Sequence, residues 1–193
     1  MQSRLTAIAV LCFASALGSA QAMTQDEYKA SKDSIEAAYK ADKKACDAMK
    51  DNAKDICMKE AKGKEDIAKA ELEAQYKPGA KATHKVADTR ADAAYSVAKE
   101  KCDDLTGNAK DVCVKDAKAE HVKAKENAKV AAAAAKPADN TAEKQANVAE
   151  ARKDAAVEKN EAAYKAAKER CDALSGDAKS KCVDDAKRMH GQN

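Results

Sequence analysis

Apolar residues recur at intervals of three and four along most of the chain, between lysines, alanines and acidic residues. Tyr95, Ala98, Cys102 and Leu105 follow this spacing, which places them on one face of a helix. Alanine, lysine and glutamate are strong helix formers. The pattern predicts an all-α protein of about six helices, with limits near 24–50, 53–76, 83–106, 109–136, 141–175 and 178–190.

One segment occurs three times, and each copy has a tyrosine seven residues before a cysteine and a second cysteine eleven residues after it. The cysteine pairs are Cys46 and Cys57, Cys102 and Cys113, and Cys171 and Cys182. Prolines at 78 and 137 separate the copies. The repeats predict three elongated helical hairpins, over 23–77, 80–136 and 139–193.

The turn of each hairpin is expected between its two cysteines. Gly107 and Gly176 lie there in the second and third copies, and glycine favours the left-handed conformation that ends a helix. Leu105 is expected to end the helix before the turn. The first copy has Asp51 in place of glycine, so its turn is less well specified. The residues expected to cap the second helix of each hairpin are Asn52, Asn108 and Asp177.

A turn at these positions brings the two cysteines of each copy opposite each other, where an intrachain disulfide is sterically reasonable. The alternative is an unbroken helix, which would hold the two sulfurs about 16 Å apart and allow only bonds between chains. Capping is also expected at two other helix starts, by Thr24 with Glu27 and by Asn140 with Glu143.

Residues 1–22 resemble a cleavable signal peptide. Arg4 precedes an apolar run over 5–17, and Ala20-Gln21-Ala22 forms a small-residue cleavage site before Met23. An uncleaved anchor is the alternative, but this run is shorter than the roughly 20 residues that span a bilayer. Cleavage removes Cys12 and leaves six of the seven cysteines. An even number of cysteines in an exported protein predicts disulfides and a periplasmic location.

The composition argues against a thick core and against a polyanion-binding protein. Residues 23–193 contain 42 alanines and neither tryptophan nor phenylalanine. Three disulfides, each worth about 3 kcal/mol, would compensate for a thin core. The composition leaves open whether the hairpins form a bundle or a loosely jointed array. Basic and acidic residues are interspersed and nearly balance, so neither nucleic acid nor anionic lipid is an expected partner.

No residue pattern predicts catalysis, a cofactor or a metal site. The cysteines of each pair straddle a turn instead of forming the Cys-x-x-Cys of redox proteins, which favours structural disulfides over redox or zinc chemistry. The histidines are isolated in sequence and are expected at the surface; they are His84, His121 and His190. The adjacent carboxylates at 103–104 and 184–185 would point about 100° apart on a helix, so they would not converge.

The motif Cys-Asp-x-Leu-x-Gly-Asn-Ala-Lys-Asp-Val-Cys, at 102–113, resembles a repeat of small exported Ala/Lys-rich proteobacterial proteins. These proteins often carry a TolA-like or cell envelope biogenesis label. The resemblance implies a role in the cell envelope and assigns no functional residues. The overall composition also resembles desiccation-protective helical proteins, in which eleven-residue spacing is common.

These observations predict a non-enzymatic periplasmic structural or interaction protein. Its expected partners are envelope proteins or a second copy of itself, and no membrane span remains after signal cleavage. The alternative is a hydrophilic stress protectant or a chaperone-like periplasmic protein. A thiol oxidoreductase with exchangeable disulfides is a third hypothesis, which a high reduction potential would indicate.

Overall fold

The structure is a computed structural model that describes residues 23–192. The predicted signal peptide therefore lies outside the described residues. The all-α prediction is confirmed, with six helices and three disulfides in the part of the chain that the structure describes. The helices are α1 (Gln25–Cys46), α2 (Asp51–Tyr76), α3 (Ala80–Lys101), α4 (Gly107–Ala135), α5 (Thr141–Cys171) and α6 (Gly176–Met189), and a short 3-10 turn, η1 (Cys102–Asp104), follows α3.

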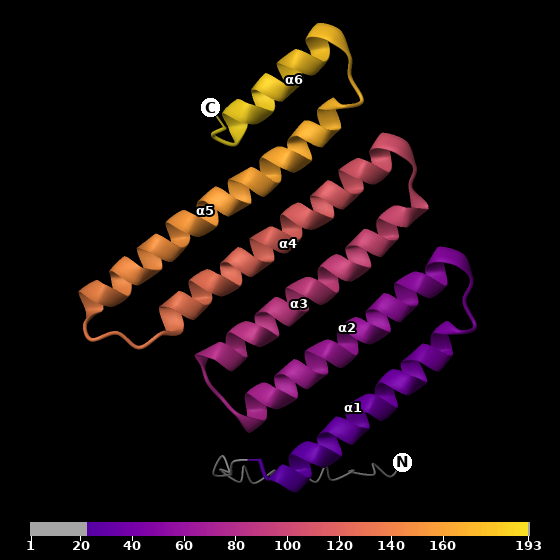
Figure 1. The fold of residues 1–193 in the computed structure, drawn as a ribbon, viewed down its shortest axis with the longest axis vertical. Coiled ribbons are helices and arrows are strands. Elements are labelled where there is room, and N and C mark those ends of the chain that lie inside the picture. Colours follow the sequence, from indigo (N-terminus) through magenta and orange to yellow (C-terminus); the bar gives the residue numbers. More distant parts are fainter. Residues whose placement is uncertain (1–22, 193) are drawn as a thin grey trace, which may run out of the picture.

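The six helices lie side by side in a single layer, and each runs antiparallel to the next (Figure 1). Helix packing joins neighbours in the sequence, from α1 through to α6. The pairs α2/α3 and α4/α5, which link different hairpins, pack at least as extensively as the pairs within hairpins. The arrangement is thus the array and not the bundle, and its joints are packed instead of loose.

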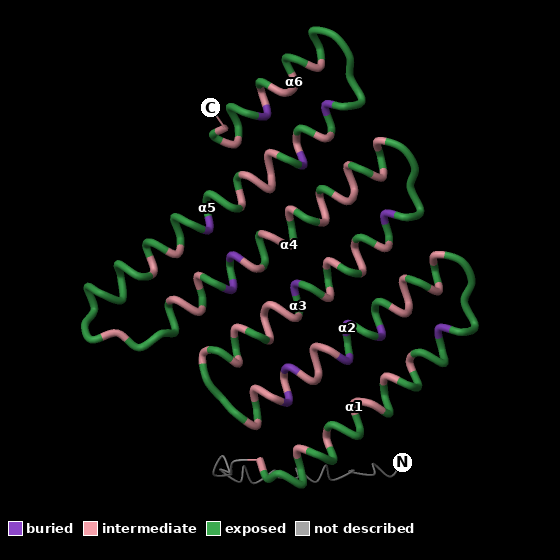
Figure 2. Tube along the Cα trace, in the orientation of Figure 1, coloured by how far each residue is buried: buried purple, intermediate pink, exposed green. Residues whose placement is uncertain are grey.

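The layer has little interior (Figure 2). Small residues dominate the buried apolar set, and Leu72 is the one large aliphatic side chain in it among residues 23–192. Cys46, Cys102 and Cys171 are the largest side chains that are fully buried in this part of the chain. Small side chains allow helices to approach closely but bury little area each. The disulfides therefore replace much of what a thick core would supply.

The first helix of each hairpin ends earlier than predicted. Helices α1 and α5 end at the first cysteine of their pair, and α3 ends one residue before it. These ends lie four or five residues before the predicted ones. Beyond the cysteine the backbone tightens into a turn, in which the N–H of Leu105 donates to the carbonyl of Cys102 at 3.0 Å. Leu105 is then extended and 41% exposed, so its predicted place on the helical face is wrong.

The turn itself is the same in all three copies. Gly107 and Gly176 each have a φ of 56°, and Asp51 has a φ of 51° at the equivalent position. Aspartate is among the few non-glycine residues that adopt this conformation readily. The first turn therefore has the same geometry as the other two, although its sequence specifies that geometry less well. All three residues begin the second helix of their hairpin instead of ending the first.

The predicted N-caps of the hairpins' second helices are also wrong. Lys50, Thr106 and Ser175 occupy the N-cap positions, and none of them makes a side-chain capping bond. Asn52 and Asn108 instead lie inside the first turn of α2 and α4, where their amides are free to reach another helix.

The caps predicted for the other helix starts are present. Thr24 and Glu27 form a reciprocal capping box at the start of α1. The side chain of Asn140 accepts a hydrogen bond from the N–H of Glu143 at 2.9 Å, while the Glu143 carboxylate accepts from the N–H of Asp139. No helix within residues 23–192 combines the length and apolar character that crossing a membrane requires.

Candidate functional site

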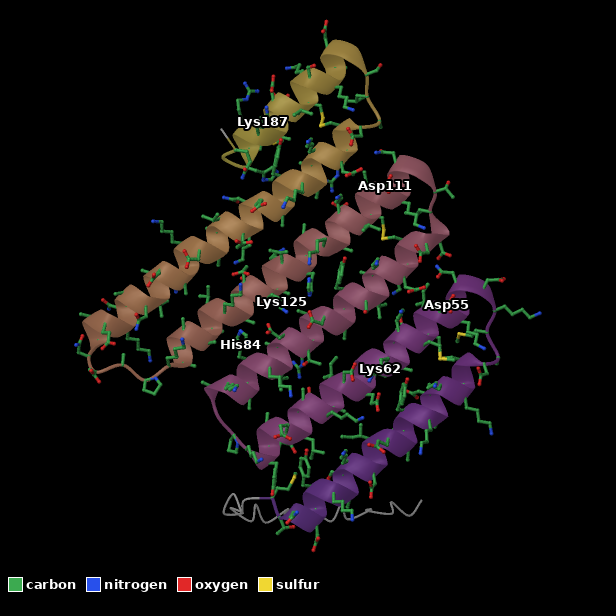
Figure 3. The ribbon with its side chains drawn as sticks, in the orientation of Figure 1. Asp55, Lys62, His84, Asp111, Lys125 and Lys187 are labelled. Carbon is green, nitrogen blue, oxygen red and sulfur yellow. A yellow bond between two sulfur atoms is a disulfide. The ribbon has the colours of Figure 1, made fainter. Side chains whose placement is uncertain are left out.

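The turns that join the two helices of each hairpin, which we call corners, lie along one edge of the layer (Figure 1). Each corner is closed by a disulfide, visible as yellow bonds in Figure 3. The bonds join Cys46 to Cys57, Cys102 to Cys113, and Cys171 to Cys182, with Cα–Cα distances of 5.6, 5.6 and 5.7 Å. The structure thus pairs all six cysteines within their own repeat, as the sequence predicted.

An ion pair crosses every corner at the same two positions. The lysine three residues before the second cysteine pairs with the aspartate directly after the first. The pairs are Lys54–Asp47 at 2.9 Å, Lys110–Asp103 at 2.9 Å and Lys179–Asp172 at 2.8 Å. The hydrogen bond from Lys179 lowers the pKa of Asp172, and the bond to Asp103 raises the pKa of Lys110. These pairs explain why Ala-Lys follows the turn in every copy.

In the first two hairpins, the tyrosine seven residues before the first cysteine packs against the second helix of its hairpin. The ammonium of Lys62 lies 5.7 Å from the ring centroid of Tyr39, and that of Lys118 lies 5.3 Å from the ring centroid of Tyr95. Both lysines lie five residues after the second cysteine of their copy. Such cation–π contacts stabilise partly exposed helix pairs.

His121 is not the exposed, isolated residue that the sequence predicted. Its side chain is 10% exposed, its Nε2 lies 2.6 Å from Oδ1 of Asp92, and its ring stacks on Tyr95. Burial raises the pKa of Asp92, but the bond to His121 and the charge of Lys125 outweigh burial, so that this pKa lies below its usual value. Sequence spacing gave no signal, because His121 and Asp92 are on different helices.

A second histidine, His84, lies close to Lys125, which also pairs with Asp92. His84 and Lys125 extend from the neighbouring helices α3 and α4 (Figure 3). Both approach Oδ2 of Asp88, at 3.5 and 4.0 Å, while Oδ1 of Asp88 is buried without a hydrogen-bond partner. Within the described range, no three His, Cys, Asp or Glu side chains are grouped so that they could hold a metal ion.

Two buried glutamates are held by lysines of their own helices. Glu65 is 7% exposed and lies 2.9 Å from Lys62 and 2.7 Å from Lys69. Burial raises its pKa, but the hydrogen bonds from Lys69 and Lys62 outweigh burial and leave the pKa below the usual value. Glu126 is 6% exposed and bonds Lys129 at 2.6 Å, which raises the pKa of that lysine.

Three of the four adjacent carboxylates form ion pairs with basic side chains. Asp103 pairs across its corner with Lys110, whereas Asp184 lies 3.8 Å from Lys187 and Asp185 pairs with Arg188. Each of these three carboxylates thus has a lysine or arginine partner of its own.

Adjacent hairpins meet at two junctions, which we define as the contacts of α2 with α3 and of α4 with α5. The amide of Asn52 donates to the carbonyl of Glu100 at 3.1 Å, and the amide of Asn108 donates to the carbonyl of Glu169 at the same distance. The two asparagines occupy the same position in their repeats, six residues after the first cysteine. The bond recurs because both junctions have the same register.

Three further contacts recur at both junctions. Lys59 approaches Glu100 at 3.7 Å, as Lys115 approaches Glu169 at 3.9 Å. The remaining equivalent pairs are Lys101–Glu60 with Arg170–Asp116, and Arg90–Glu71 with Lys159–Asn127. The junctions are therefore a second repeated feature of the molecule, which sequence reasoning missed because each contact joins residues of different repeats.

At the first junction the helices approach each other closely beside Gly63. A Cβ atom at this position would lie 3.0 Å from the Cβ of Ala93 on α3. The glycine therefore sets how closely α2 and α3 pack. Ala119 occupies the equivalent position on α4.

No protein-family model, curated protein or solved structure matches this chain.

Proposed function

We propose that the protein is an exported, non-enzymatic helical scaffold of the cell envelope, which acts in the periplasm with its disulfides formed. The observation that carries this proposal is that, within residues 23–192, the largest fully buried side chains are disulfide cysteines. A fold held in this way depends on an oxidising compartment, since cytosolic thiols are kept reduced. The predicted signal peptide supplies the route to such a compartment.

The single layer suits a scaffold. Both broad faces and both outer helices of the layer are accessible to partners (Figure 2). The ion pairs and the His121–Asp92 pair hold neighbouring helices together, so structural contacts account for the charged groups at these positions.

Thiol trapping in cells tests the proposal. The full-length chain is compared with a variant that lacks residues 1–22, and free thiols are alkylated with a mass-tagged reagent before electrophoresis. The full-length chain should lose Cys12 with its leader and show no free thiols, while the truncated chain should show six. Free thiols in the full-length protein, or retention of Cys12, would refute export with oxidation.

A second candidate, a chaperone-like protectant, is favoured by one observation. A groove between α3 and α4 is lined by six alanines with Tyr95, Val112 and Cys113, and its other lining residues are Asp116, Glu120 and His121. Such an apolar surface can contact unfolded chains. Suppression of the aggregation of several unrelated proteins would support this function, and its absence would leave the scaffold proposal.

A further inference from the structure

The two outer helices, α1 and α6, carry charged residues at the positions that form an ion pair at each junction. The signs are reversed: α6 has the acidic residue and α1 has the basic one. On α6, Asp184 stands two residues after the second cysteine, where α2 and α4 have Lys59 and Lys115. On α1, Lys44 stands two residues before the first cysteine, where α3 and α5 have Glu100 and Glu169. At each junction a lysine of the preceding hairpin pairs with a glutamate of the following one. If α6 of one copy packed against α1 of another, the corresponding pair would be Asp184 with Lys44.

The register of the junctions shows that these two residues face away from their own hairpins. Glu100 and Glu169 reach back to the preceding hairpin, so Lys44 occupies the side of α1 that is turned away from α2. Lys44 is exposed and makes no ion pair within residues 23–192. Asp184 has a single partner at 3.8 Å and remains 70% exposed. Both charges are therefore accessible to a second molecule.

The side of α1 that carries Lys44 also has small residues, as does the side of α5 that packs against α4. Helix α5 has Ala162 and Ala166 on the side whose Lys159 and Arg170 contact α4, and Ala166 is 3% exposed. The equivalent positions on α1 are alanines as well, and both are exposed: Ala37 and Ala41. The part of the α5 surface that lies near the corner and faces α4 thus recurs uncovered on α1.

We propose that copies of this protein associate head to tail, with α6 of one copy against α1 of the next and Asp184 paired with Lys44 of the second copy. The inference deepens the proposed scaffold function, on which it rests, by naming a partner. The contact is heterologous, so repetition adds copies in a row and continues the layer.

The side chains of α6 make this contact weaker than the internal junctions. Asp177 stands where Asn52 and Asn108 donate to a backbone carbonyl, and a carboxylate cannot donate. Arg188 stands where Gly63 allows close approach. The association is therefore reversible and depends on salt, because an exposed ion pair contributes about 0.2–1 kcal/mol.

The test is a charge-exchange cycle in purified, oxidised protein, with association constants from sedimentation equilibrium at low salt. Lys44→Glu and Asp184→Lys each place like charges at the contact and should weaken association about threefold to tenfold. The double variant places the new lysine of one copy against the new glutamate of the next, as at the internal junctions, and should restore association. The matched control is Lys32→Glu, which makes the same charge change on another face of α1.

Three results would overturn the inference. They are a wild-type protein that stays monomeric at the highest soluble concentration, single variants that associate like wild type, and a double variant that is not restored. The last result would indicate that α1 contacts a different surface, such as α1 of another copy. None of these results bears on export and oxidation, which thiol trapping tests separately. Circular dichroism of each variant is the control for folding.

Discussion

The three disulfides should differ in what they hold in place, and the difference follows from the layer. Helix α6 has 14 residues, packs against α5 among the described helices, and buries one residue, Ala186. An isolated helix of this length is marginal in water. Replacement of Cys171 and Cys182 with alanine should therefore release α6 from an otherwise folded protein.

The size of the effect on α6 follows from the loop that the disulfide closes. The cysteines are 11 residues apart, and a closed loop of this size is worth about 3 kcal/mol in the chain-entropy model. At about 1.4 kcal/mol per tenfold change, α6 should open on the order of a hundred times more often. The same replacement of Cys102 and Cys113 should leave α3 and α4 in place, because each also packs against a helix of another hairpin.

Hydrogen exchange measured by mass spectrometry distinguishes the two double variants. Amides of 176–189 should lose about two decades of protection in the Cys171/Cys182 variant. In the Cys102/Cys113 variant, amides in the middle of α3 and α4 should lose much less. Equal losses at both sites would refute the claim that packing between hairpins anchors the inner helices.

The remaining predictions concern the junctions and the buried charges. Gly63→Leu should lower the stability of the protein by about 1–3 kcal/mol in thermal melts, because the added side chain separates α2 from α3, whereas Lys64→Leu should not. Asn108→Asp should cost about 1 kcal/mol in urea unfolding, since it removes the donor to a backbone carbonyl, while Asp177→Asn in the same assay should cost nothing. The pKa of Glu65 is lowered from 4.5 in the folded protein, so this group stabilises the fold above that pH, and its contribution is lost as pH falls through the lower folded value. Glu65→Gln should therefore reduce the fall in melting temperature between about pH 5 and pH 2, and an unchanged slope would contradict this account.

Local features of the fold could be predicted from the sequence because they depend on residues close together in the chain. The cysteine pairing follows from the spacing of Tyr95, Cys102 and Gly107 within one repeat. The helix limits were less accurate, because a disulfide at the end of a helix favours a tight turn that helix propensity does not report. At Asp51 the left-handed conformation was not predicted, although aspartate adopts it more readily than most residues other than glycine.

Contacts between repeats could not be predicted, because they join residues far apart in the chain. Asn52 and Glu100 are 48 residues apart, and Asn108 and Glu169 are 61 apart. Asparagine is a common N-cap residue, so both positions were predicted to cap a helix. In the structure each amide instead donates a hydrogen bond to a backbone carbonyl of the next hairpin. The layer arises from these junctions, and they become recognisable only when the three copies are compared at equivalent positions.

The most direct test of the central claim is non-reducing peptide mapping of the protein recovered from the periplasm. Trypsin can cleave within all three corners, at Lys50, Lys110 and Lys179, so each disulfide should link two separate peptides. The account predicts the pairs Cys46–Cys57, Cys102–Cys113 and Cys171–Cys182 and no others. A bond between different repeats, or free thiols in the periplasmic protein, would contradict it.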